Sequence, residues 1–117
     1  MNSIRALIVA AAVALVATAA ASPMSHPRLT GAVGPGFTIS LKQGTKLVKT
    51  LRGGTYTFVV TDKANIHSFH LKGPGLSKVI AAVGFTGTKT VTLALKKGTY
   101  TYVCDVHSSM VGHFKVL

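Results

Sequence analysis

The 117-residue chain has no tryptophan, no glutamate, one cysteine and only two acidic residues, Asp62 and Asp105. The scarcity of carboxylates excludes an enzyme whose acid–base chemistry needs a pair of acidic side chains. The absence of glutamate, a good helix former, together with many threonines, valines and glycines, favours strands and turns. A single cysteine leaves three roles open, namely an intermolecular bond, a buried inert thiol or a reactive thiolate.

Positive charge dominates the chain, because 13 lysines and arginines give a formal net charge of +11. Such a charge is consistent with a solvated basic surface, or with attraction to an acidic protein, an anionic membrane or a cell-wall polymer. Nucleic acid is the usual alternative. Apart from the pair Lys96-Lys97 the lysines are scattered singly, and neither an RNA-binding aromatic signature nor a recognition helix accompanies them. We therefore expect no nucleic-acid ligand.

The N-terminus has the pattern of an export signal. A short basic segment, Met1–Arg5, precedes the apolar run Ala6–Ala20, and small residues follow. This pattern predicts a secretory signal peptide over residues 1–21, cleaved between Ala21 and Ser22. An uncleaved anchor is the alternative, but the run is shorter than the roughly 20 residues that a membrane span needs. We expect a periplasmic, cell-surface or secreted protein without stable membrane insertion after cleavage.

The rest of the chain divides into a lead and one domain. Residues 22–36 contain three prolines and three glycines and predict a flexible lead. From residue 37 to residue 117, apolar and polar residues alternate with period two between turn signals. The expected strands are 37–41, 47–51, 55–60, 66–71, 89–95, 99–104 and 112–117, and residues 76–84 fit either a strand or a helical turn. Seven to eight short strands predict an all-β domain, an antiparallel Greek-key β-sandwich or barrel.

The only cysteine lies in a segment rich in metal-binding side chains. Cys104 is followed by His107 and Met110, with two residues in each gap. Thiolate, imidazole and thioether are ligands that suit copper. An exposed thiol outside the cytoplasm would be oxidised, and metal ligation is one way to protect it.

A distant histidine can complete this set. On the predicted strand 66–71, His67 shares the inward face with Phe69 and Leu71, whereas His70 points to the other face. His67 is thus either a core histidine that bonds a backbone carbonyl or a ligand held by the scaffold.

These residues carry a resemblance to a known family. The segments Ile66–Leu71, before Gly73-Pro74-Gly75, and Tyr102–Gly112 resemble those of the cupredoxins, the small blue copper proteins related to plastocyanin and amicyanin. The resemblance spans residues 37–117. It implies one type 1 copper ion, and the ligands that it implies are His67, Cys104, His107 and Met110.

One residue departs from the pattern of that family. Many members have asparagine directly after the first histidine, where its side chain ties the ligand loop to the scaffold, and this chain has Ser68. Because contacts around the ligands tune a metal site, Ser68 bears on the redox potential and on the rigidity of the loop.

The leading hypothesis is an exported carrier that cycles between Cu(I) and Cu(II) and exchanges single electrons with an acidic redox partner. The alternative is a copper-binding or chaperone protein of the cell envelope without a redox role. A third class is a plain β-sandwich surface module with an inert cysteine. We do not expect an enzyme, because a Cys–His nucleophile at Cys104 would lack a third group that orients the base.

Overall fold

Ten β-strands form the part of the chain that the structure, a computed structural model, describes, residues 25–117. The strands are β1 (Arg28–Val33), β2 (Ile39–Gln43), β3 (Lys46–Leu47), β4 (Thr50–Leu51), β5 (Gly54–Asp62), β6 (Phe69–Gly73), β7 (Leu76–Ala81), β8 (Gly87–Leu95), β9 (Gly98–Cys104) and β10 (His107–Val116). The predicted signal peptide, residues 1–21, lies outside the described residues.

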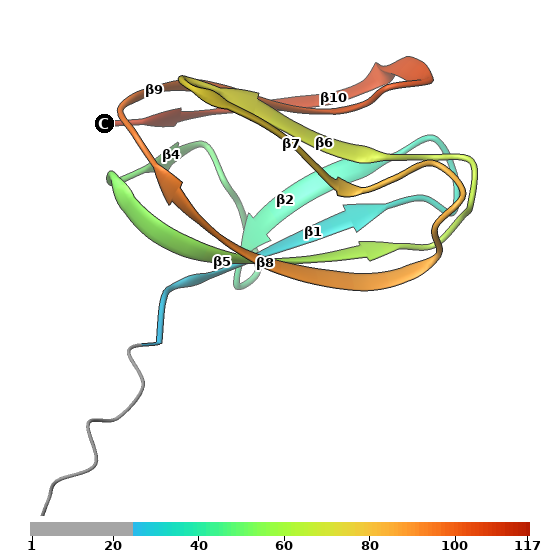
Figure 1. The fold of residues 1–117 in the computed structure, drawn as a ribbon, viewed down its shortest axis with the longest axis horizontal. Helices are drawn as coiled ribbons and strands as arrows, with labels where there is room; N and C mark the ends of the chain where they lie inside the picture. The colour runs from blue at the N-terminus through green and yellow to red at the C-terminus, as the bar shows by residue number, and fades with distance from the viewer. Residues whose placement is uncertain (1–24) are drawn as a thin grey trace, which may run out of the picture.

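The strands form two five-stranded sheets that face each other (Figure 1). The order is β3-β2-β1-β5-β8 in the first sheet and β4-β10-β9-β6-β7 in the second. The predicted all-β sandwich is confirmed, and over residues 25–117 the sheets do not close into a barrel. The expectation of purely antiparallel pairing was wrong in two places, because β1 pairs with β5 and β4 with β10 in parallel. Two of the strands, β3 and β4, are only two residues long, so the count exceeds the seven to eight expected.

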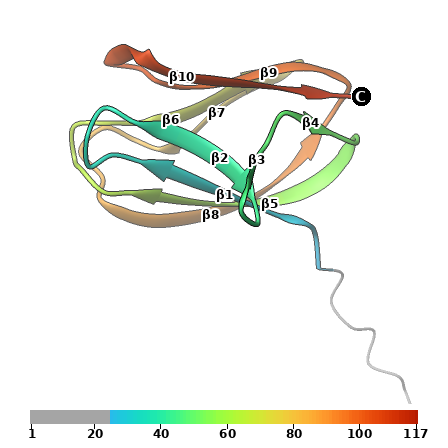
Figure 2. The ribbon, with the colours of Figure 1, turned by 180° about the vertical axis from the view of Figure 1, so that it is seen from behind.

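Part of the predicted lead belongs to the domain. Strand β1 lies inside residues 22–36 and occupies the centre of the first sheet, between β2 and β5 (Figure 2). Leu29 and Val33 are fully buried, and an added Cβ at Gly31 would lie 2.9 Å from Cγ2 of Val60. The glycine that suggested a turn is thus required for close packing within a strand. The domain extends at least to Arg28, and the expected start at Phe37 is corrected accordingly.

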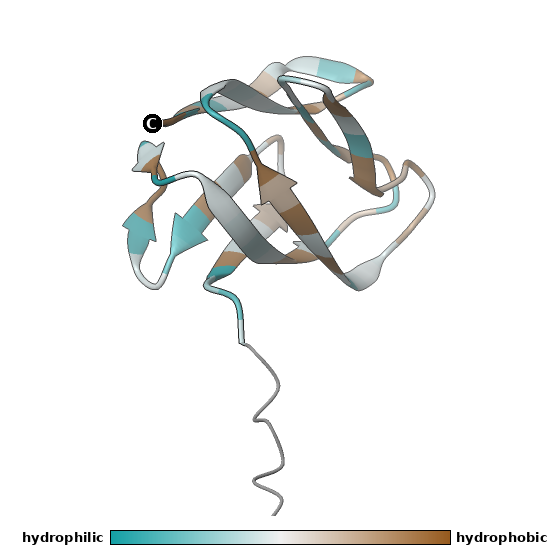
Figure 3. Ribbon diagram, turned by 60° about the vertical axis from the view of Figure 1, so that its left-hand side comes forward, coloured by the Kyte–Doolittle hydropathy of each residue, from teal (hydrophilic) through white to brown (hydrophobic). Residues whose placement is uncertain are grey.

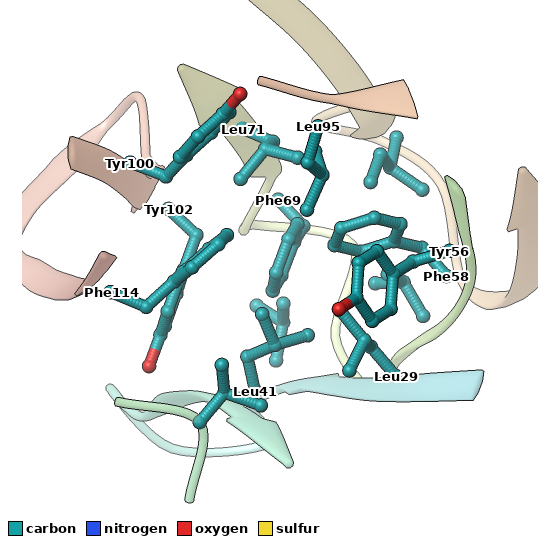
Figure 4. Packing of buried hydrophobic residues seen from close by; sticks show 14 of the residues in the cluster. Leu29, Leu41, Tyr56, Phe58, Phe69, Leu71, Leu95, Tyr100, Tyr102 and Phe114 are labelled. Carbon is teal, nitrogen blue, oxygen red and sulfur yellow. The ribbon is translucent and has the colours of Figure 1, made fainter. Parts of the chain in front are cut away.

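The core lies between the sheets and is rich in aromatic residues (Figure 4). Tyr100 stacks on Phe114 with ring centroids 5.1 Å apart, and Phe69 stacks on Tyr102 at 5.5 Å. The ring of Tyr102 lies directly over Gly112, where a Cβ would collide with it. These residues come from β6, β9 and β10, so stacked rings join the strands that meet at the β9–β10 connection.

The predicted alternation along the strands is observed. Every second residue of β5 from Tyr56 to Asp62 is buried, and the same holds for β9 from Tyr100 to Cys104. Apolar and polar residues accordingly share the same strands (Figure 3). Residues 76–84, left open between strand and helix, form β7 up to Ala81.

Candidate metal centre

Pairing within the second sheet brings the predicted site residues together. Cys104 is the last residue of β9, and His107 opens β10 after a tight two-residue turn. His67 lies two residues before β6, which pairs with β9 through the register His70↔Val103. The neighbouring strands therefore place a residue from far along the chain beside the β9–β10 connection.

The donor atoms of these three side chains converge. The Nδ1 atoms of His67 and His107 lie 3.1 Å apart. The Sγ of Cys104 lies 3.5 Å from Nδ1 of His107 and 4.0 Å from Nδ1 of His67. Nitrogen and sulfur ligands lie about 2.0–2.3 Å from an ion, so two that share one ion are at most about 4.4 Å apart. All three separations satisfy this limit, and the residues fit a metal ion.

The site is shielded from solvent on its scaffold side. His67 and Cys104 are fully buried, whereas His107 is half-buried and marks the exposed side. The ring of Phe37 meets both imidazoles edge-on, with centroids 5.6 Å from His67 and 5.0 Å from His107. The Nε2 atom of His67 is buried without a hydrogen-bond partner, so this residue engages the cluster through Nδ1 alone.

Met110, the fourth predicted ligand, lies in an irregular part of β10. The pairing of β10 with β9 shifts register between His107 and Val111, which is the signature of a bulge. Met110 is buried there, whereas Ser108 and Ser109 are exposed. A regular ladder would alternate the side chains strictly, so the bulge sets which of these residues turns inward.

The loop that carries His67 is fixed by backbone contacts. The Oδ1 of Asp62 accepts a hydrogen bond of 3.0 Å from the N–H of Ala64, and the N–H of Gly84 donates to the carbonyl of Asn65 at 2.8 Å. His67 was expected inside a strand, but it lies just ahead of β6. Its predicted inward direction was nevertheless correct, and His70 is partly exposed.

Ser68 ties this loop to the cysteine loop. Its N–H points at the Cys104 sulfur from 3.3 Å. Its hydroxyl accepts a hydrogen bond from the N–H of Asp105 at 2.9 Å and donates to Oδ2 of the same residue at 3.0 Å. The serine therefore provides a link between the two loops, as expected of the asparagine that it replaces.

Asp105 is held from a second side, by a residue that the sequence did not single out for this role. The Nδ1 of His70 lies 2.8 Å from Oδ1 of Asp105, and its Nε2 lies 2.7 Å from the hydroxyl of Ser77. Burial alone raises the pKa of Asp105, but the hydrogen bonds from His70 and Ser68 and the charge of Lys72 outweigh it, so the pKa lies below its usual value. In the sequence, the position of Asp105 directly after Cys104 was the available signal for this network.

Comparison with solved structures places this architecture in a known group. The chain resembles the copper protein rusticyanin at 23% identity, with a TM-score of 0.54 and coverage of 77% of this chain and 76% of the other. Reduced rusticyanin matches at 27% identity, with a TM-score of 0.52 and 77% and 78% coverage. Rusticyanin from Thiobacillus ferrooxidans matches at 28% identity, with a TM-score of 0.50 and 77% and 76% coverage.

The chain has the cupredoxin fold. Neither a protein-family model nor a curated protein sequence matches it. The resemblance predicted from its two segments is confirmed, and the cupredoxin sandwich brings His67, Cys104 and His107 to one end.

Exposed apolar side chains accompany the cluster at this end of the cupredoxin sandwich. Phe37 is 66% exposed, and Ile66 and Val106, the neighbours of two cluster histidines, are 49% and 57% exposed. Val111, after Met110, is 41% exposed. We refer to Phe37, Ile66, Val106 and Val111 as the apolar rim.

Proposed function

We propose that the protein is a type 1 copper protein that carries single electrons, with His67, Cys104, His107 and Met110 as ligands of one copper ion. The observation that supports this most directly is the convergence of the His67, Cys104 and His107 donor atoms within 4.0 Å. Two imidazoles and a thiolate, with a weak thioether, are the ligand set of blue-copper electron-transfer sites. When bound, copper would supply the one-electron Cu(I)/Cu(II) couple.

The role of the chain's own residues is to keep this ligand set nearly unchanged in both oxidation states. Ser68 and the backbone contacts of the His67 loop hold the scaffold ligand, and the hydrogen bonds to Asp105 hold the cysteine loop. Burial of Cys104 protects the thiolate from oxidants other than the metal. A site that rearranges little can exchange electrons quickly.

Half-buried His107, beside the apolar rim, offers the shortest exit for an electron. We propose that redox partners dock on this rim. The positive charge predicted an acidic partner, and that remains a prediction. Among the basic residues of 25–117, however, only Lys63 lies on a loop at this end. Steering by charge would therefore act at long range, with apolar contact at the site itself.

An extracytoplasmic location is part of the proposal, because it rests on the export pattern of residues 1–21. Among residues 25–117, no helix is long and apolar enough to cross a membrane.

A copper-binding or chaperone role is the second candidate, because it would use the same donors. Addition of Cu(II) to the metal-free protein separates the two functions. A carrier gives an intense blue thiolate-to-copper absorption that ascorbate bleaches and an oxidant restores. A colourless protein that binds only Cu(I) would contradict the carrier role.

The substitution Cys104→Ser tests the ligand assignment. We expect it to abolish the blue colour, while Ser109→Ala, an exposed serine of the same loop, keeps it. Persistence of the colour in Cys104→Ser would show that another residue supplies the sulfur.

A further inference from the structure

The charges of the molecule are separated along its length. Asp62 ends β5 beside the His67 loop, and Asp105 follows Cys104. Both acidic side chains therefore lie at the end of the sandwich that holds the cluster of His67, Cys104 and His107, which we call the metal end. At the opposite end of the sandwich five exposed cations gather, which we call the basic end: Lys49, Arg52, Lys96, Lys97 and Lys115. Since the sequence has no other acidic side chain, no carboxylate side chain pairs with the cations of the basic end.

Contacts between strand ends show that these cations lie on neighbouring segments. The N–H of Lys115 donates to the carbonyl of Lys49 at 2.9 Å. Gly54 pairs with Leu95, which brings the turn with Arg52 beside the turn with Lys96 and Lys97. Gly98 in turn pairs with Val116 on β10. In Figure 1 the C-terminus, β4 and the connection from β8 to β9 accordingly lie on one side, opposite the connection from β9 to β10.

The backbone of the basic end is anchored in the core. The hydroxyl of Tyr56 donates to the carbonyl of Arg52 at 2.7 Å. The hydroxyl of Tyr100 accepts a hydrogen bond from the N–H of Lys96 at 2.8 Å and donates to its carbonyl at 2.9 Å. The turns are therefore fixed in place, while the long basic side chains remain free to follow a surface.

The basic end lies far from the proposed metal ligands. An electron-transfer partner docked at those ligands would therefore not contact the basic end. β9 runs from Gly98 at the basic end to Cys104 at the metal end and is seven residues long. At about 3.4 Å per residue, its ends lie about 20 Å apart, and the paired strand β10 spans the same length because of its irregularity. The basic end therefore serves a different contact from the apolar rim.

The direction of the N-terminal chain indicates what that contact is. The N–H of Thr57, near the start of β5, donates to the carbonyl of Pro27 at 2.9 Å. Since β5 starts at the basic end and β1 runs parallel to it, the chain enters the domain on the basic side. The apolar run Ala6–Ala20, the core of the predicted signal peptide, precedes this point in the sequence.

We propose that the basic end binds the anionic headgroups of a phospholipid membrane and points the metal end away from it. Lysine and arginine near an anionic bilayer contribute additively, and the attraction acts within a Debye length. Until the predicted cleavage after Ala21, the N-terminal run would hold this side of the domain next to the bilayer, which favours a lipid surface over an acidic protein. The inference rests on the proposed function only where it assigns the metal end, which points away from the membrane, to redox partners. Lipid binding itself does not require copper.

The test is co-sedimentation of the processed, copper-loaded protein with phosphatidylcholine vesicles that contain or lack phosphatidylglycerol. We expect binding to the anionic vesicles alone, and its loss at high salt. The double variant Lys96→Gln/Lys97→Gln should weaken partitioning about 25-fold, at about fivefold for each charge. The control Lys63→Gln/Lys89→Gln removes the same charge from the half of the sandwich that contains the metal site and should change partitioning less than about twofold.

Several results would overturn the proposal. Equal losses in the two double variants would show that net charge acts without a defined surface. Equal binding to neutral vesicles would assign the association to apolar contact, such as that of the apolar rim, and not to charge. No vesicle binding together with retention on immobilised polyglutamate would assign the basic end to an acidic protein. Cys104→Ser should bind vesicles like the parent protein. The blue colour of the copper-loaded parent tests the copper assignment, and vesicle binding tests the membrane proposal, so the two proposals can fail separately.

Discussion

Asp105, the residue after the site cysteine, accepts a 2.8 Å hydrogen bond on Oδ1 from Nδ1 of His70 on β6, the strand that directly follows the loop with His67. The contact joins the ligand loop to β6 independently of any metal. The other carboxylate oxygen of Asp105, Oδ2, accepts a hydrogen bond from the hydroxyl of Ser68, so both oxygens are hydrogen-bonded.

The pair His70–Asp105 should be energetically coupled. We expect a double-mutant cycle of His70→Gln and Asp105→Asn to give about 0.5–1 kcal/mol, because Asp105 is partly exposed to solvent. Urea unfolding of the metal-free variants measures it. Copper-loaded His70→Gln should keep its blue band, since His70 is outside the ligand set. Strict additivity of the two substitutions would mean that the contact contributes nothing to stability.

The lowered pKa of Asp105 predicts a defined dependence of stability on pH. A carboxyl with a lower pKa in the folded state stabilises it above the unfolded value, about 3.9, and this contribution is lost as the pH falls through the folded value. In metal-free protein, the stability advantage over Asp105→Asn should be constant near neutral pH and shrink below about pH 4. Unfolding curves across this range measure it. An advantage that grows on acidification would contradict the sign.

Ser68 should determine how firmly the two loops are joined. Ser68→Ala removes two hydrogen bonds with Asp105 and leaves the N–H of Asp105 without an acceptor. We therefore expect the free energy of unfolding to fall by about 1–3 kcal/mol. Ser68→Asn, which restores the more common residue of the family, should recover part of the loss. Chemical unfolding gives both values. If Ser68→Ala is as stable as the parent, the link is not what holds the loop.

Gly112 should be intolerant of any side chain. A Cβ at this position would collide with the ring of Tyr102, which is stacked on Phe69 and cannot move freely. Gly112→Ala should therefore destabilise the protein by about 1–3 kcal/mol, as overpacking of a core does. Gly36→Ala is the matched control, because nothing lies within 4 Å of its Cβ position. Thermal unfolding of the two variants should differ clearly, and equal midpoints would contradict the packing argument.

The site was more predictable than the scaffold around it. Cys104 and His107 are close in sequence, and alternation correctly directed His67 inward. The long strands β5, β8 and β9 follow the period-two pattern because one side faces the core and the other solvent.

Other features depend on contacts between segments that no local pattern records. β1 has only Leu29 and Val33 as large buried apolar residues, and the prolines and glycines of residues 22–36 around it indicated a flexible segment. Its parallel pairing with β5 has no signature in either strand alone. The contact of His70 with Asp105 spans 35 residues and depends on the register of β6 against β9.

The separation of the proposed ligands along the chain has a consequence for how the protein would mature. Three of them, Cys104, His107 and Met110, are near neighbours, so even an unfolded polypeptide could chelate copper with this segment. His67 joins them only after β6 has found β9, a contact across 37 residues. Copper held before that step is bound by an incomplete set, and the preference of the ion for the native over the denatured chain depends largely on one imidazole.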